Sequence, residues 1–96
     1  MSQIRITPET MRQRAASYHQ QSETIQQVIS TMDKLLRTLQ DEWEGAASRA
    51  YVTEYNRLRP GFVQAQDMAQ TISDNLNKIA NATERQDQEI AGQLGG

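Results

Sequence analysis

Asp41-Glu42-Trp43-Glu44-Gly45 stands near the middle of the 96-residue chain and divides it into two long segments. The first segment, 9–40, contains neither glycine nor proline, and the second contains the pair Pro60-Gly61 before glycine returns at Gly92. Glycine adopts backbone conformations that residues with side chains resist, which suits a tight reversal of the chain. The sequence therefore predicts a turn over 41–45 between two helices.

Signals at the helix ends give the boundaries of these segments. Thr7 followed by Pro8 is typical of an N-cap and a first helical position. We expect an N-terminal extension over 1–7, a first helix over 8–40, a second helix over 46–90 and a C-terminal tail over 91–96. Proline inside a helix removes one hydrogen bond and crowds the preceding turn, so a kink is expected at Pro60.

Both segments carry an apolar stripe with spacings of four and three residues. The first stripe consists of Met11, Ala15, Tyr18, Ser22, Ile25, Ile29, Met32, Leu36 and Leu39, and the second of Tyr51, Tyr55, Leu58, Phe62, Ala65, Ala69, Ile72, Leu76 and Ile79. An average repeat of 3.5 residues favours left-handed, coiled-coil-like packing of helices. Strict alternation, the pattern of a strand, is absent from the sequence.

The two stripes mirror one another about a centre between Trp43 and Glu44. This symmetry pairs Leu36 with Tyr51 and Tyr18 with Ala69 if the two helices fold back on each other. It predicts an antiparallel helical hairpin about 50 Å long, from a rise of about 1.5 Å per residue.

A second, narrower column of apolar residues lies beside the stripes. Val28 and Leu35 extend the first stripe, and Met68 lies beside the second. Two helices alone enclose little core, and a spare apolar stripe usually meets a partner. The prediction is an all-α fold in which two hairpins form a four-helix bundle, with Val28, Leu35 and Met68 in the dimer interface. The alternative is that Val28 and Leu35 only broaden the seam within one hairpin.

Composition excludes several classes of function. The net charge of −2 lacks the basic excess of a nucleic-acid binder, and the absence of cysteine excludes disulfides. His19 is the single histidine, so no zinc site, cofactor site or nucleophile–base set is expected. No apolar run is long enough for stable membrane insertion, and the N-terminus lacks the apolar core of a cleavable signal peptide. We therefore expect a non-enzymatic protein.

Trp43-x-Gly45 between two heptad stripes, followed by Ala47 and Tyr51, resembles the WXG100 (ESAT-6-like) family. The resemblance covers essentially the whole chain. It implies a protein made in the cytoplasm and exported by a type VII (ESX/Ess) secretion system without a cleavable signal. It further implies a homodimeric or heterodimeric four-helix bundle, and as partners the secretion machinery including its membrane ATPase.

The resemblance also points to an export signal after the second helix. One form of the family signal needs a tyrosine near the C-terminus, and none follows Tyr55. The form seen in homodimeric members is matched in spacing by Asp87, Ile90 and Leu94, with Thr83 at the first, normally hydrophobic, position. Residues beyond about 80 have no counterpart on the first helix in the mirrored alignment. We expect them to be free to bind a receptor as a helix in a groove.

Three functional hypotheses follow. The leading one is a secreted dimer, acting as an effector or adaptor with a role in virulence, which displays the turn of one chain beside the C-terminal segment of its partner. The second is an escort module that heterodimerises with the helical N-terminal domain of a larger secreted toxin. The third, membrane disruption by an amphipathic hairpin, is disfavoured because the polar faces are not enriched in basic residues.

Overall fold

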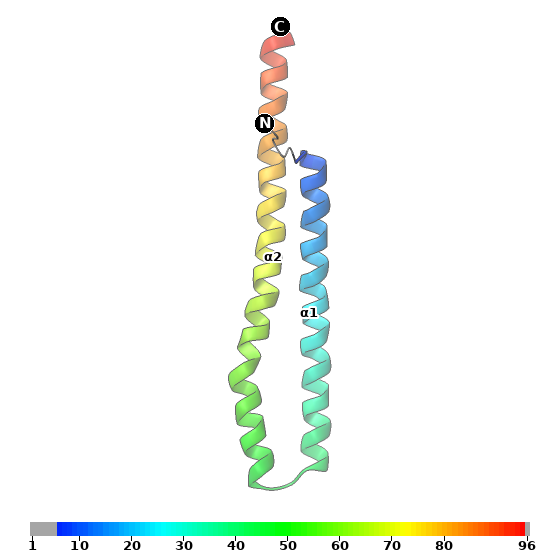
Figure 1. The fold of residues 1–96 in the computed structure, drawn as a ribbon, viewed down its shortest axis with the longest axis vertical. Helices are drawn as coiled ribbons and strands as arrows, with labels where there is room; N and C mark the ends of the chain where they lie inside the picture. The colour runs from blue at the N-terminus through cyan, green and yellow to red at the C-terminus, as the bar shows by residue number, and fades with distance from the viewer. Residues whose placement is uncertain (1–5, 96) are drawn as a thin grey trace, which may run out of the picture.

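Two antiparallel helices form the whole of the described structure, a computed structural model that covers residues 6–95. Helix α1 spans Pro8–Glu42 and α2 spans Ala46–Gly95, and they lie side by side as a long hairpin (Figure 1). The molecule measures 77 × 25 × 17 Å. It is longer than the predicted hairpin because α2, with 50 residues against 35, projects past the start of α1.

The start of α1 has the predicted cap. The Thr7 hydroxyl accepts a hydrogen bond of 3.0 Å from the Thr10 amide, and the Met11 amide donates to the Thr7 carbonyl at 2.9 Å. Pro8 takes the first helical position, where its missing N–H group costs nothing. The helix continues to Glu42, two residues beyond the predicted end at 40.

Helix α2 is longer than the sequence predicts. It passes without a break through Pro60, and Figure 1 shows it bowing away from α1 in the half nearer the turn. The expectation of a C-terminal tail over 91–96 is wrong for residues 91–95, which belong to α2. Gly92 lowers helix propensity by only about 1 kcal/mol relative to alanine, and its neighbours are ordinary helix formers.

The tightest packing of the two helices lies away from the turn. Most of the buried residues there are small, and together they comprise Met11, Ala15, Ser22, Ile29, Ala69, Ser73 and Ala80. Among the described residues from 30 to 68, none is buried. Small side chains allow close approach of the helices at the open end, whereas the turn half is loosely packed.

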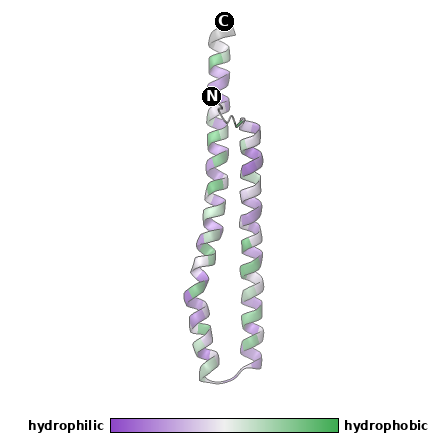
Figure 2. Cartoon of the chain, viewed as in Figure 1, coloured by the Kyte–Doolittle hydropathy of each residue, from purple (hydrophilic) through white to green (hydrophobic). Residues whose placement is uncertain are grey.

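The predicted seam is confirmed in part. The buried residues of α1, and Ala69 on α2, all belong to the predicted stripes. Tyr51, Leu58, Phe62 and Ile79 of the second stripe are 43–55% exposed. Tyr18, expected to face Ala69, is 41% exposed. Hydrophobic residues recur along both helices (Figure 2). A seam between only two helices buries just part of so wide an apolar stripe.

Polar side chains form hydrogen bonds between α1 and α2 along the edge of this seam. Asp33 bonds Tyr55 and Arg59, His19 bonds Gln70, and Arg12 bonds both Asn81 and Glu84. In every one of these pairs the α2 residue lies further along the chain than the mirrored alignment predicts. These directional hydrogen bonds add contacts between the helices that the spacing of the apolar residues does not predict.

Candidate functional site

The turn places Trp43 at the end of the helix pair. Trp43 is the C-cap of α1 with an extended backbone, and Gly45 has φ = +107°, the conformation that its lack of a side chain permits. The Arg49 amide donates to the Gly45 carbonyl at 3.3 Å and begins α2. The Trp43 ring lies 5.7 Å from that of Tyr51, tilted by 51°, and remains 38% exposed.

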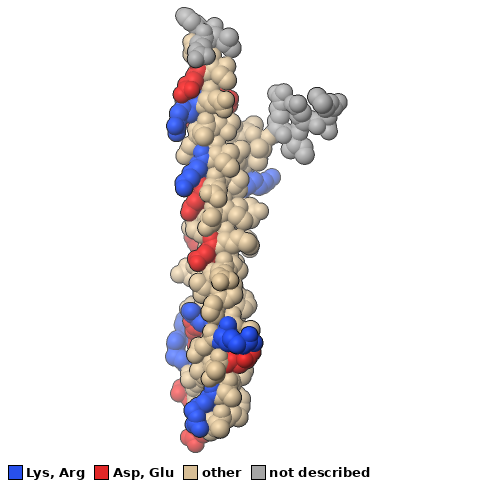
Figure 3. Space-filling model, turned by 90° about the vertical axis from the view of Figure 1, so that its left-hand side faces the viewer, with Lys and Arg blue, Asp and Glu red and all other residues tan. Residues whose placement is uncertain are grey.

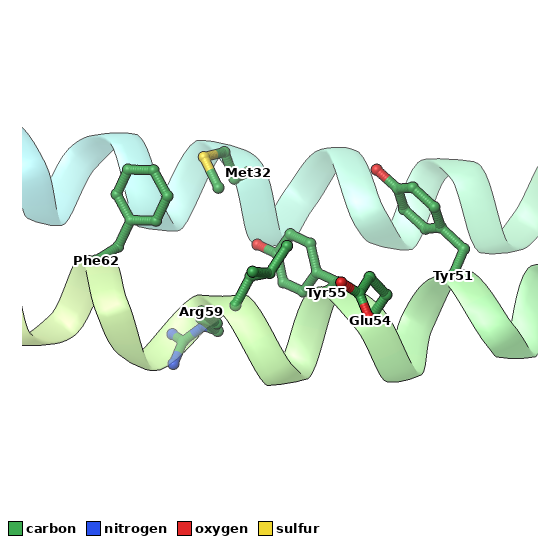
Figure 4. Close-up of a pocket in the computed structure, with 7 residues that line it drawn as sticks. Met32, Tyr51, Glu54, Tyr55, Arg59 and Phe62 are labelled. Carbon is green, nitrogen blue, oxygen red and sulfur yellow. The ribbon is translucent and has the colours of Figure 1, made fainter.

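An apolar face covers one side of the turn half. It consists of Met32, Leu35, Leu36, Leu39, Tyr51, Tyr55, Leu58 and Phe62, which line two adjoining hollows. Met32, Tyr51 and Tyr55 line both hollows, so the exposed stripes of α1 and α2 lie on the same side of the hairpin. In Figure 4, Tyr51, Tyr55 and Phe62 extend from α2 toward α1, and Met32 extends from α1.

The predicted interface residues are exposed but do not form one cluster. Val28 is 41% exposed and lines a shallow hollow with Met32, next to the apolar face. Leu35 belongs to the apolar face and is 58% exposed. Met68 is 62% exposed on α2 and lines neither hollow of the apolar face.

A charged network crosses the seam beside the apolar face. The Arg59 guanidinium donates from Nε and Nη2 to the two carboxylate oxygens of Asp33 at 3.0 and 2.9 Å. The Tyr55 hydroxyl donates to the same carboxylate at 2.6 Å. Hydrogen bonds from Arg59, and then from Tyr55, lower the pKa of Asp33 from 3.8 to about 2. The hydroxyl of Tyr55 has a raised pKa, because of burial and its bond to Asp33.

His19 links the two helices nearer the open end. Its Nδ1 lies 2.7 Å from Gln70 Oε1 and its Nε2 lies 2.6 Å from Glu23 Oε1. A ring that donates to both oxygens carries both protons. The hydrogen bond to Gln70, followed by the charge of Glu23, raises the pKa of His19 above 6.5. This environment suits a pH-dependent link rather than a metal ligand.

The projecting end of α2 begins later than predicted. Arg12 donates to Glu84 Oε2 and Asn81 Oδ1, both at 2.8 Å, so residues 81–84 still have a partner on α1. Thr83 is also half-buried. Beyond Glu84, Asp87 is exposed and Ile90 is 47% exposed, whereas the Leu94 side chain lies outside the described part of the structure.

The remaining surface offers few other sites. Within residues 6–95 no group of three or more His, Asp or Glu side chains is arranged to hold a metal ion. Neither described helix has a stretch apolar enough to span a bilayer. Figure 3 shows acidic and basic groups next to one another on the α2 side. Glu54 and Arg57 form an ion pair within α2. The mixture of signs on this face does not form a large basic or acidic patch.

Comparison with known proteins shows the family to which the chain belongs. The profile of WXG100, described as proteins of 100 residues with WXG, matches residues 3–88. The chain belongs to the WXG100 family. Members are small helical proteins without enzymatic activity.

Two relatives and two solved structures illustrate the relationship. Over 93 residues the chain is 34% identical to Protein YukE of Bacillus subtilis, covering 97% of this chain and 96% of YukE. Over 95 residues it is 28% identical to type VII secretion system extracellular protein A of Staphylococcus aureus, covering 99% and 98% of the two chains.

EsxA of Geobacillus thermodenitrificans superposes with a TM-score of 0.84 at 35% identity, over 95% of this WXG100 chain and all of that one. The secreted protein EsxB of Bacillus anthracis superposes with a TM-score of 0.81 over 91% and 99% of the two chains. At 24% identity, the second match supports the hairpin fold alone.

Sequence reasoning missed the polar residues of the seam. Asp33, Arg59 and His19 lie outside the apolar stripes, so the stripes predict no contact for them between the helices. One signal was available, since Asp33, Arg59 and Gln66 follow the same heptad steps as the stripes, displaced by one position. Polar residues at helical spacing beside an apolar stripe can mark a seam when the stripe itself faces a partner.

Proposed function

We propose that this WXG100 protein is a substrate of a type VII secretion system, exported from the cytoplasm as a folded dimer. In this dimer two hairpins pack through their apolar faces into a four-helix bundle. The similarity to an extracellular protein of the staphylococcal type VII system supports the export assignment. The secreted dimer then acts outside the cell as an effector or adaptor, and a role in virulence stays a prediction.

The exposed apolar face is the observation that carries the proposal. Large side chains of both helices are 37–62% exposed, and no large side chain of the described residues is fully buried. Burial of apolar surface contributes about 25 cal/mol per Å², so an unpartnered face of this length strongly favours association. A second copy offers a surface of the same shape and composition, as expected for a two-fold interface.

The proposed interface includes Val28, Leu35 and Met68. Leu35 belongs to the apolar face and Val28 adjoins it, so both lie where a second hairpin would pack. Met68 lies further along α2 and would contact the edge of the partner. Because Leu35 is 58% exposed in the single chain, its apolar surface becomes buried only on assembly.

The projecting end of α2 is the proposed export signal. Asp87 and Ile90 lie beyond the last contact with α1, and their spacing places them with Leu94 on one helix face. In an antiparallel dimer this segment would lie near Trp43 and Gly45 of the partner. Such a composite surface exists only after assembly, so the membrane ATPase of the secretion machinery would select dimers for export.

Mass measurement in solution tests the dimer. Light scattering of the purified chain is expected to give twice the monomer mass, and Leu35→Glu is expected to give the monomer mass because it places a charge in the apolar interface. Gln20→Glu adds the same charge at an exposed position and is the control. A monomeric wild-type protein at high concentration contradicts the proposal.

A secretion assay tests the export assignment. The protein is expected in the culture medium of a host with an intact type VII system and only in the cells when the membrane ATPase is deleted. Equal secretion from both strains contradicts the assignment. A cytoplasmic protein followed in the same samples reports cell lysis.

The alternative is an escort module for the helical N-terminal domain of a larger secreted toxin. The same apolar face favours it, since a related hairpin could occupy the position of the second copy. Co-expression followed by purification separates the two proposals. A homodimer that persists beside the toxin domain favours the first, and exchange into a one-to-one heterodimer favours the second.

A further inference from the structure

A row of apolar side chains on α1 recurs every seven residues and is centred between Val28 and Ile29. Residues seven apart share one face of helices that pack like a coiled coil. Met32 and Leu39 of this row line the hollows of the apolar face, so the rest of the row extends that face toward the open end. None of its members is buried, and they are Tyr18, Ile25, Met32 and Leu39.

A matching row on α2 is centred on Ala65. It also belongs to the apolar face and has no buried member, and it comprises Tyr51, Leu58, Ala65, Ile72 and Ile79. The centres of the two rows lie at the same level of the hairpin, because Ile29 of α1 lines one hollow together with Val63 and Gln66 of α2. Both rows are therefore symmetric about a single level of the molecule.

This shared centre is what a two-fold interface between two hairpins requires. An axis that crosses the helices at right angles reverses the second copy and sets residues at equal distances from the centre opposite one another. Tyr18 then lies opposite the partner's Leu39, and Leu58 lies opposite the partner's Ile72. The loosely packed turn half of each copy thereby meets the closely packed open half of the other. A parallel pairing would instead stack the two turn halves on each other.

Gly61 is not explained by the fold of a single chain. It lies within α2, and Gly45 is the described glycine with a positive φ, so the backbone at 61 does not require glycine. A Cβ at position 61 would meet nothing within 4 Å in the hairpin. Glycine inside a helix lowers its stability relative to alanine. Neither the backbone nor the packing of one chain therefore accounts for glycine at this position.

Met68 has the complementary shape on the same helix. It is 62% exposed, and it stands seven residues after Gly61, with Ala65 between them. An axis beside Ala65 therefore sets Met68 of one copy opposite Gly61 of the other. The unbranched methionine side chain adapts well to an irregular gap, and the missing side chain at 61 provides one.

Charged residues at the ends of the interface favour the same orientation. Arg14 and Glu42 lie in one heptad row with Val28 and Leu35, and both are exposed. With Val28 beside the axis, Arg14 of each copy lies opposite the partner's Glu42. Neither forms an ion pair with another residue whose side chain the structure describes. Opposite charges placed in this way select the antiparallel orientation.

We propose that two copies of the chain pair about a two-fold axis that passes beside Val28 and Ala65, with the partner's Met68 seated over Gly61. In this arrangement α1 packs on the partner's α1 and α2 packs on the partner's α2. The inference rests on the dimer proposed above and specifies its register. Gly61 and Met68 are its specificity-determining residues, because they fit a partner that carries the same two residues.

Disulfide crosslinking tests the register. The chain has no cysteine, and a residue beside a two-fold axis lies next to its own copy, so Ala65→Cys is expected to give a covalent dimer on oxidation with copper phenanthroline. Asp67→Cys is the exposed control, about 200° further around α2, and is expected to crosslink far more slowly. A dimer in which both variants crosslink at equal rates overturns the register and leaves the dimer itself in place.

A mixture of tagged Gly61→Cys and untagged Met68→Cys chains tests the contact between these two positions. The mixed covalent dimer is expected to form in preference to either self-crosslinked dimer. Two cysteines at 61 and 68 of one chain could not bridge, because two helical turns separate them. A mixed product no more abundant than random pairing overturns the placement of Met68 over Gly61.

The dimer dissociation constant, from sedimentation equilibrium, gives a second measurement. Gly61→Leu is expected to raise it by about tenfold or more, because the new side chain occupies the place of the partner's Met68. Gly61→Leu/Met68→Ala restores space and is expected to bind more tightly than Gly61→Leu alone. Asn56→Leu adds the same side chain at an exposed position outside both rows and is the control.

Circular dichroism is expected to show unchanged helicity in all three variants. Equal dissociation constants for Gly61→Leu and the wild type overturn the contact, as does a double variant that binds no better than Gly61→Leu. A wild-type chain that stays monomeric at every concentration overturns the dimer and its register together.

Discussion

Arg12 and Glu84 form the last charged contact between α1 and α2 before α2 continues alone. Arg12 Nη1 lies 2.8 Å from Glu84 Oε2, and its Nη2 bonds Asn81 on the same helix. Ala80, fully buried just before this contact, allows α1 to lie close to α2. The contact therefore marks the boundary between the hairpin and the projecting segment that we propose as the export signal.

Loss of this contact is expected to loosen the base of the projecting segment. Arg12→Ala should increase amide hydrogen exchange over residues 80–92 and lower global stability by about 0.5 kcal/mol, the range of a partly exposed ion pair. Arg14→Ala removes a neighbouring exposed arginine and is the control. Identical exchange in the Arg12 variant and the wild type would show that Arg12 does not fix this boundary.

Gly45 and Gly61 are expected to respond in opposite directions to replacement by alanine. Gly45→Ala places a side chain at φ = +107° and should cost about 1–3 kcal/mol. Gly61→Ala lies within α2, where an added Cβ meets nothing within 4 Å, and should stabilise the helix by about 0.5–1 kcal/mol. Urea unfolding measures both changes, and a stabilising Gly45→Ala would contradict the assigned turn conformation.

Substitutions in the proposed export surface are expected to stop secretion while the hairpin stays folded. Asp87→Asn and Trp43→Ala should each abolish secretion through the type VII system, because they alter the two halves of the proposed composite surface. Both residues are exposed, so helicity by circular dichroism should stay near that of the wild type. Gln88→Ala is the matched control on the same segment. Normal export of both variants would refute the recognition proposal.

His19 is expected to stabilise the hairpin more at mildly acidic pH than at alkaline pH. The pKa of His19 is raised above 6.5 in the folded chain, so its contribution is complete below pH 6.5 and is lost as the pH rises through the folded value. An NMR titration measures this pKa directly, and Gln70→Ala should lower it. A folded pKa at or below 6.5 would contradict the link to α2.

Asp33 is expected to stabilise the hairpin less as the solution becomes strongly acidic, which is the opposite pH dependence to that of His19. Its folded pKa of about 2 lies below the ordinary 3.8, so its contribution is present above pH 3.8 and is lost as the pH falls through about 2. Thermal unfolding of the wild type should show this loss, and Asp33→Asn should lack it. A variant with the same acid profile as the wild type would show that the network does not stabilise the fold.

Several features were predictable because they depend on local chemistry. Thr7 and Pro8 start α1 through a cap formed by adjacent residues, and Gly45 ends the turn through its own φ angle. The end of α2 was less predictable, since Gly92 and the residues after it have weak and mixed preferences. The stripes predicted the buried seam in part, because an apolar stripe wider than one seam does not specify which of its residues stay exposed.

The sequence by itself determined two long helices and their reversal at Trp43-x-Gly45, since capping, periodicity and turn chemistry act over a few residues. Only the tertiary structure decided which faces meet. Hydrogen bonds of Asp33, Arg59, His19 and Arg12 across the seam have narrow geometric limits, whereas apolar contacts tolerate several rotations. Which residues of each apolar stripe are buried between the helices, and which stay exposed, is seen only in the structure.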